Sequence, residues 1–124
     1  MTVRRLRGQA AHAGGLDAEA VACAALVAEG WTVLGRRLRT PAGEVDAVVE
    51  KDGLLAFVEV KRRATLAGAA AALSGRQCAR LLAAAEILLA VHPGWGAAGV
   101  RFDVVLVDRH RRVRRIADAF RLEG

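Results

Sequence analysis

Four charged residues interrupt two otherwise apolar stretches, and their spacing suits metal-dependent chemistry. Glu44 and Asp46 stand two apart in "GEVDAVVE", and Glu59 and Lys61 stand two apart in "FVEVKRR". Alternate side chains of an extended strand share a face, so each pair projects to one side of its strand. Burying a carboxylate beside an ammonium costs desolvation free energy unless the two pair or serve a site.

If the two strands form a hairpin, the four charged groups gather near one end of one sheet face. Neighbouring carboxylates suit Mg²⁺ or Mn²⁺, which prefer oxygen ligands. Such a cation can hold a scissile phosphate and lower the pKa of a bound water. A lysine beside it can orient that water or offset developing negative charge.

The lysine content singles out one of these residues. The chain has 19 Lys and Arg residues in all, and only Lys51 and Lys61 are lysines. Lys51 lies in the turn "EKDG", where any hydrophilic residue suffices. Lys61 lies inside a strand, which suggests that a compact, titratable ammonium is required there.

Length and composition indicate one compact domain. The chain has 124 residues, of which 54% are hydrophobic, and this excludes intrinsic disorder. We expect a flexible basic segment over residues 1–14 and a single domain over 15–124. No apolar stretch approaches the roughly 18 residues of a membrane helix, and the start lacks a signal-peptide core, so we expect a cytoplasmic protein without membrane contact.

Charge and cysteine usage narrow the partners. The formal net charge of +6 is compatible with a polyanionic partner. Cys23 and Cys78 lie far apart, without a CxxC motif or a histidine at ligand spacing, so we expect two buried reduced thiols rather than a disulfide or zinc site. The sequence contains no GxxxxGK phosphate loop, and its single serine, Ser74, makes a Ser-His-Asp hydrolase improbable.

Periodicity and turn signals predict an α/β fold. The order is α-β-β-β-α-β-β, a central mixed sheet flanked by helices. Residues 44–62 form an antiparallel hairpin around "KDG", and helical periodicity predicts helices over about 16–29 and 76–91. Asp17 or the glycines before it cap the first helix. An alanine-rich helical segment is expected from about Leu66 to a break at Ser74-Gly75.

The arrangement resembles the D…ExK pattern of PD-(D/E)XK nucleases, since Asp46 precedes Glu59-Val60-Lys61 by twelve intervening residues. More closely, the chain resembles the small bacterial YraN-like proteins, which are similar in core to archaeal Holliday-junction resolvases. That family typically reads G-x-x-[GA]-E-x-x-A…L…G-[WY], then G-E-[IV]-D, F-V-E-V-K and R-F-D-V-V. The corresponding stretches here are residues 15–31, 43–46, 57–61 and 101–105.

The resemblance implies a restriction-endonuclease-like fold and roles for individual residues. Asp46 and Glu59 would bind Mg²⁺ or Mn²⁺ with the backbone carbonyl of Val60, and Lys61 would assist the attacking water. Glu19 on the first helix matches an acidic position that can complete the site. Glu44 is a further candidate that binds metal indirectly or caps the turn.

Several basic positions are candidates for contact with a nucleic-acid backbone. The family often carries Lys where this chain has Gln77, and Asn where it has Arg37. Solvated turns explain the arginine clusters nearly as well. The candidate contacts are Arg36, Arg37, Arg39, Arg62, Arg63 and Gln77, with a further arginine cluster at 109–115.

Three functions remain open from the sequence. The first is a metal-dependent endonuclease or nuclease-like protein that hydrolyses phosphodiester bonds of DNA, including branched or single-stranded DNA, with a homodimer implied by the resolvase resemblance. The second is a non-catalytic nucleic-acid-binding or partner-docking module on the same fold. The third is a structural interaction protein whose basic surface is incidental. Asp103 is expected to be structural, and Glu59 with Lys61 could be a plain surface pair.

Overall fold

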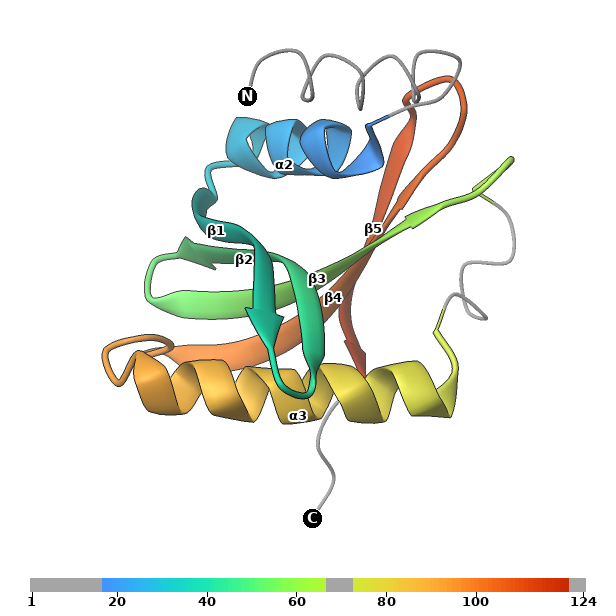
Figure 1. Cartoon of the computed structure of the whole chain (residues 1–124). Helices are drawn as coiled ribbons and strands as arrows, with labels where there is room; N and C mark the ends of the chain where they lie inside the picture. The colour runs from blue at the N-terminus through green and yellow to red at the C-terminus, as the bar shows by residue number, and fades with distance from the viewer. Residues whose placement is uncertain (1–16, 67–72, 121–124) are drawn as a thin grey trace, which may run out of the picture.

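The computed structural model describes residues 17–66 and 73–120. Their elements follow the expected order α-β-β-β-α-β-β, which confirms the predicted α/β class (Figure 1). The observed bounds are α2 (Ala18–Ala28), β1 (Thr32–Thr40), β2 (Gly43–Lys51), β3 (Leu54–Arg62), α3 (Gly75–Val91), β4 (Gly99–Val107) and β5 (Val113–Phe120).

The strands form one mixed sheet in the order β1-β2-β3-β4-β5. Neighbouring strands are antiparallel except β3 and β4, which are parallel and are connected through α3. A parallel pair needs such a crossover because the chain must return to the same end of the sheet. The hairpin predicted over 44–62 is confirmed as β2 and β3, with Lys51 paired to Leu54 across a tight turn.

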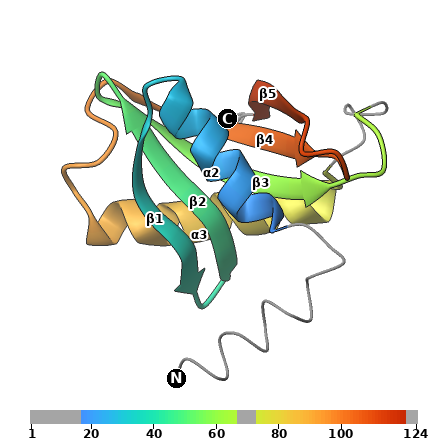
Figure 2. The same cartoon turned by 90° about the horizontal axis from the view of Figure 1, so that it is seen from above.

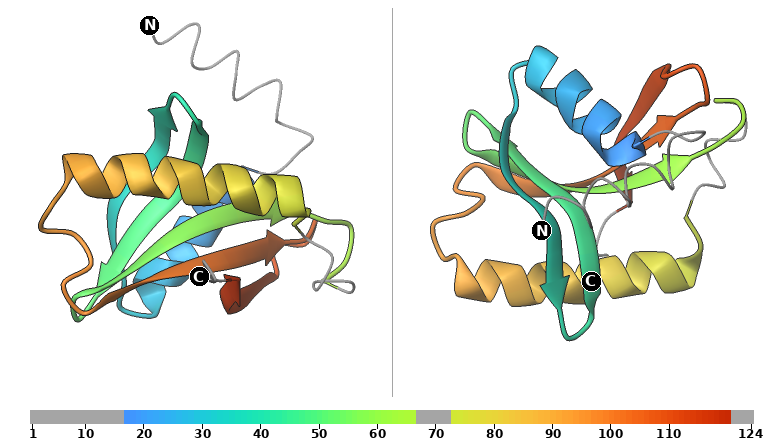
Figure 3. Two further views of the ribbon diagram at one scale, coloured as in Figure 1. Left: turned by 90° about the horizontal axis from the view of Figure 1, so that it is seen from below. Right: turned by 45° about the horizontal axis from the view of Figure 1, so that its top comes forward.

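The two helices cover opposite faces of the sheet (Figures 1, 2 and 3). On the α2 face Ala22 and Leu26 pack against side chains from β2, β3 and β4, and Trp31 completes this core. On the α3 face Leu81 and Leu88 pack with aromatic rings that include Phe57. The sheet is therefore buried on both sides, as its nearly continuous apolar strands require.

Side chains cap both helices. Asp17 is the N-cap of α2 and accepts a hydrogen bond from the Ala20 N–H, which confirms one of the two predicted caps. Ser74 caps α3 through a reciprocal capping box with Gln77. The predicted break at Ser74-Gly75 is thus the start of a helix.

Two sequence predictions need amendment. The alanine-rich helical segment falls largely on residues 67–72, which lie outside the described residues, and Leu66 itself lies in a bend. Both cysteines are free, as predicted, but Cys78 is only half-buried while Cys23 is buried. Cys78 lies near the start of α3, where part of its surface stays accessible.

Asp103 in β4 is a buried structural hub, as expected from the sequence. Its carboxylate has no exposed surface and accepts two hydrogen bonds of 2.9 Å from Arg101, besides one from the Asp118 N–H. The guanidinium groups of Arg101 and Arg115 also lie over the Trp31 ring. These contacts join β4 and β5 to the segment after α2.

Replacing Asp103 by asparagine should strongly destabilise the fold, because the change removes a fully buried counter-charge from the partly covered guanidinium groups of Arg101 and Arg115. Removing one partner of a buried ion pair typically lowers the free energy of unfolding by about 3–5 kcal/mol. Urea denaturation followed by circular dichroism measures the loss. Asp52→Asn, the same change at an exposed turn position, is the control. Equal stability of the two variants would contradict this role of Asp103.

Candidate metal centre

At one pair of residues, the side chains of the β1–β2 hairpin switch from one face of the sheet to the other. Arg37 lies between two register pairs, opposite Asp46, and has a left-handed backbone with φ of 52°. Val45 packs in the core on the α3 face, whereas Ala47, only two residues further, packs on the α2 face. The hairpin consequently swings from the α2 side to reach α3 with its tip (Figure 1).

Regular pairing of β2 with β3 ends at the point where the hairpin switches faces. The last register pair is Ala47 with Val58, so the β3 backbone beyond that point loses its neighbour on this side. The carboxylate of Asp46 fills the gap by accepting a hydrogen bond of 2.8 Å from the Val60 N–H. Asp46 is thereby fixed against β3, with one carboxylate oxygen engaged.

Three carboxylates converge at this gap. Oxygen atoms of Glu19 from α2, and of Glu44 and Asp46 from β2, all lie within 4.8 Å of one another. Glu19 stands in the first turn of α2, and its carboxylate reaches the β1–β2 hairpin through its ion pair with Arg37. Carboxylate oxygens at such separations are the donor set that a hard divalent cation takes, so the residues present fit Mg²⁺ or Mn²⁺.

The neighbouring pair from β3 adjoins this cluster. Lys61 Nζ lies 3.1 Å from Glu59 Oε2, and both side chains are largely buried, with exposed fractions of 18% and 14%. Glu59 also acts on the Asp46 carboxyl and raises its pKa. The structure therefore brings together Asp46, Glu59 and Lys61, and it places the two further candidates from the sequence, Glu19 and Glu44, beside Asp46.

Cations neutralise most of these carboxylates. Glu19 Oε1 lies 2.6 Å from Arg37 Nε and 4.0 Å from Arg36 Nη2, and Glu44 lies 3.6 Å from Arg39 Nε. Within residues 17–66 and 73–120, Asp46 alone among the four acidic residues has no Lys or Arg within ion-pairing distance.

The missing counter-charge is reflected in the titration of Asp46. Burial raises the pKa of its carboxyl to about 7, against an ordinary value of 3.8. The Val60 N–H opposes this rise by stabilising the anion, whereas the negative charges of Glu59 and Glu19 add to it. In the absence of a divalent cation, Asp46 therefore takes up a proton as the pH falls below about 7.

Some of the residues predicted to contact nucleic acid contact other groups of the protein instead. Arg36, Arg37 and Arg39 turn toward the carboxylates, as described above. Gln77 uses its amide oxygen in the capping box of α3. Arg62 and Arg63 are exposed at the end of β3, where the Arg63 N–H bonds to Val107.

Two features of the fold escaped sequence reasoning. Lys51 Nζ donates a hydrogen bond of 2.7 Å to the Glu29 carbonyl and so caps the C-terminus of α2, although its turn position indicated no specific role. The left-handed backbone at Arg37 was also missed, because arginine carries no signal for it. The opposite charges of Glu19 and of the β1 arginines were the sequence signal that could have indicated their contact.

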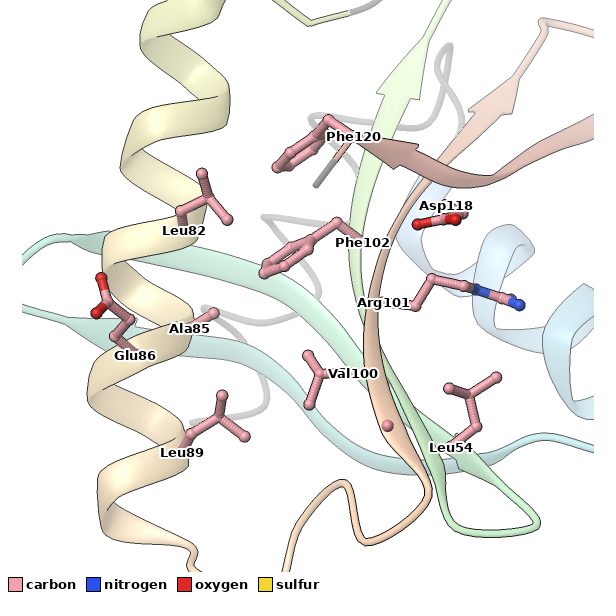
Figure 4. Close-up of a pocket in the computed structure, with 11 residues that line it drawn as sticks. Leu54, Leu82, Ala85, Glu86, Leu89, Val100, Arg101, Phe102, Asp118 and Phe120 are labelled. Atoms are coloured by element: carbon pink, nitrogen blue, oxygen red, sulfur yellow. The ribbon is translucent and has the colours of Figure 1, made fainter. Parts of the chain in front are cut away.

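A cavity of about 550 Å³ lies elsewhere in the molecule, between α3 and the strands β4 and β5 (Figure 4). Leu82 and Leu89 line it from the helix, and Phe102 and Phe120 line it from the sheet. None of the carboxylates of the cluster contributes to its wall. Its lining is mainly apolar but includes Glu86, Arg101 and Asp118, and the described residues form no group of three potential cation ligands there.

Fold and site together define an α/β protein with a mixed sheet and an acidic cluster at a break between two strands. The chain belongs to the uncharacterised protein family UPF0102, whose family model matches residues 18–107. This confirms the family resemblance seen in the motifs. No helix of residues 17–66 and 73–120 is long and apolar enough to cross a membrane.

Relatives match over nearly the whole chain. A UPF0102 protein of Granulibacter bethesdensis is 60% identical over 118 residues, which cover 95% of this chain and 75% of the relative. A UPF0102 protein of Azorhizobium caulinodans is 50% identical over 123 residues, which cover 99% of this chain and 94% of the relative. A UPF0102 protein of a Bradyrhizobium species is 46% identical over 111 residues, which cover 90% of this chain and 79% of the relative.

The raised pKa of Asp46 predicts how stability depends on pH. Between about pH 4 and 7 the folded protein holds a proton on Asp46 that the unfolded chain has released, so raising the pH through this window lowers the free energy of unfolding. The Asp46→Asn variant has no carboxyl at this position to lose a proton, so its free energy of unfolding does not fall for this reason. It should therefore gain stability over the parent as pH rises from 5 to 8, in denaturant titrations with EDTA.

Asp52→Asn is the matched control, because it removes the same charge from an exposed turn. Its difference from the parent should stay nearly constant over this range. If the difference in free energy of unfolding between Asp46→Asn and the parent is also constant, Asp46 is ionised over the whole range and its pKa is not raised.

Proposed function

We propose that this protein is a metal-dependent nuclease of the PD-(D/E)XK type that hydrolyses phosphodiester bonds in DNA. The observation that carries the proposal is the carboxylate of Asp46, which has no Lys or Arg within ion-pairing distance among the described residues. It lies within 4.8 Å of two further carboxylates and beside the Glu59–Lys61 pair. A purely structural cluster has no need to bury a third acid without a counter-charge. A divalent cation would supply that charge.

Each residue has a separate task in this proposal. Asp46, with Glu19 and Glu44, would hold Mg²⁺ or Mn²⁺, and Glu59 would share the cation from β3 with the Val60 carbonyl. The cation, when bound, polarises the phosphodiester and acidifies the attacking water. Lys61 would orient that water and offset the charge that develops on the phosphate oxygens.

The geometry around Lys61 supports its part. The ammonium is held 3.1 Å from Glu59 on a strand with little side-chain freedom, and most of its surface is covered. A fixed, partly desolvated ammonium interacts more strongly with a developing anion than a solvated one. Its three N–H donors can contact Glu59 and a phosphate oxygen at the same time.

One observation favours the rival, a non-catalytic nucleic-acid-binding module. Arg37 and Arg39 already neutralise Glu19 and Glu44, so a cation must displace these ion pairs or share their carboxylates. A module that binds DNA without cleaving it would keep the ion pairs and need no cation. Metal affinity and cleavage therefore separate the two functions.

Asp46→Asn should abolish binding of Mg²⁺ or Mn²⁺ and DNA cleavage while preserving the fold, because the amide removes the charge that the cation needs. Isothermal titration calorimetry with Mn²⁺, with and without DNA, measures the first effect. Incubation with labelled linear, flapped and four-way DNA in Mn²⁺, Mg²⁺ or EDTA measures the second. Asp52→Asn should bind and cleave as the parent does. Absence of metal binding by the parent, even with DNA present, would sink the catalytic proposal.

Lys61→Arg tests the ammonium specifically. Arginine keeps the positive charge but replaces a compact donor with a wide planar fork, so DNA binding should survive while cleavage falls by about 10²-fold. Lys51→Arg, the same change at the other lysine, should leave cleavage unchanged. Cleavage by Lys61→Arg at the parental rate would reduce Lys61 to a structural partner of Glu59.

A further inference from the structure

Some exposed arginines carry their charge outward instead of toward the acidic cluster. Four of them stand where β3, β4 and β5 end or turn, and we call this group the arginine edge: Arg62, Arg109, Arg111 and Arg114. Within residues 17–66 and 73–120, none of the four side chains makes an ion pair or hydrogen bond. The arginines of β1, by contrast, are paired with carboxylates.

A buried carboxylate holds the turn that presents two of these arginines. Asp108, with no exposed surface, accepts hydrogen bonds from the N–H groups of His110 and Arg112 and from Arg112 Nε. Arg111 adopts a left-handed backbone with φ of 65° in this turn. The turn is thus fixed internally, and Arg109 and Arg111 project from it with no internal partner among the described residues.

The sheet register links the edge to the candidate metal centre. Lys61 pairs with Leu106 across β3 and β4, and Leu106 pairs with Arg114 across β4 and β5. Residues that pair directly across a sheet project to the same face. Arg114 therefore shares a face with Lys61, with their backbones two strand spacings, about 10 Å, apart. This distance equals the rise of about three nucleotides along the axis of a DNA duplex, at about 3.4 Å each.

The composition of the edge selects the kind of partner. The exposed large hydrophobic side chains of the described residues are Val27, Leu34, Val91 and Val100, and none belongs to the edge or its turn. A membrane-binding surface would combine basic residues with apolar side chains that enter the lipid. Unpaired guanidinium groups without such side chains suit the regularly spaced phosphates of a nucleic acid.

We propose that the arginine edge binds the backbone of double-stranded DNA and thereby directs a phosphodiester to Lys61 and Glu59. The choice of DNA rests on the proposed nuclease function, whereas the position of the surface rests on the free guanidinium groups and the register. The main binding surface then lies at the β4–β5 turn, and the β1 arginines serve chiefly as counter-charges of the cluster.

The test measures binding apart from cleavage. Fluorescence anisotropy of a labelled DNA duplex is recorded in EDTA, over a range of salt concentrations, with all variants made on the full chain carrying Asp46→Asn. Arg109→Gln/Arg114→Gln should bind several-fold more weakly, and the slope of log affinity against log salt should fall by about two. Arg109→Lys/Arg114→Lys keeps both charges and should retain most of the slope.

A comparison variant and two other probes make the test decisive. Arg39→Gln removes one charge beside Glu44, and it should weaken binding less than Arg114→Gln does. An equal or larger loss in Arg39→Gln would place the surface on β1 and overturn the proposal. Tighter binding of the Asp46→Asn chain to duplex RNA or to phosphatidylserine vesicles than to the DNA duplex would also overturn it.

Failure of the proposal differs from failure of the nuclease function. If the parent neither binds Mn²⁺ nor cleaves DNA, but the edge variants lose DNA affinity as expected, the edge stands on a non-catalytic module. If the parent cleaves DNA but the edge variants bind DNA as tightly as the Asp46→Asn chain without edge substitutions, the nuclease stands and the arginine edge is refuted. Circular dichroism of each variant verifies that the fold is intact.

Discussion

The hydrogen bond from the Val60 N–H to Asp46 is the contact on which the site depends. It lies where β2 leaves β3, and it satisfies a backbone donor that the sheet would otherwise leave without a partner. A carboxylate in this position cannot retreat to solvent without exposing that gap. The fold thus holds a carboxyl group at a place where burial disfavours its charged form.

The charges around this contact are arranged in pairs of decreasing solvent access. Arg39 with Glu44 lies at the surface, Arg37 with Glu19 lies deeper, and Lys61 with Glu59 is largely enclosed. Surface pairs contribute little to stability, generally less than about 1 kcal/mol, because water screens them. Their effect here is on the local potential, which they keep close to balance everywhere except at Asp46. An arriving cation would meet one unbalanced acid surrounded by acids whose partners can exchange.

The elements were predictable because local signals agreed with the global fold. The "KDG" turn between alternating apolar runs specified the hairpin of β2 and β3, and Ser74 marked the start of α3. The acidic and basic residues of the site were visible as interruptions of apolar strands. Their partners were not, because contact between Glu19 and Arg37 depends on how α2 lies across the sheet.

The backbone turnover at Arg37 shows a limit of a different kind. A left-handed residue is normally announced by Gly, Asn or Asp, and arginine at this position gives no such signal. The fully enclosed Asp108 was equally hidden, since an aspartate near charged neighbours looks solvated until its hydrogen-bond donors are known. In each case tertiary contacts overrode local preference.

The scarcity of lysine makes the molecule a natural reporter for amine chemistry. Only Lys51 and Lys61 carry a side-chain amine; the first lies on an exposed turn and the second in the acidic cluster with 18% of its side chain exposed. Among side-chain amines, an acylating reagent would therefore label one on the surface and one that is shielded in every molecule. The ratio of the two labels, read by mass spectrometry, gives an internally calibrated measure of how far the cluster opens, without any substitution in the chain.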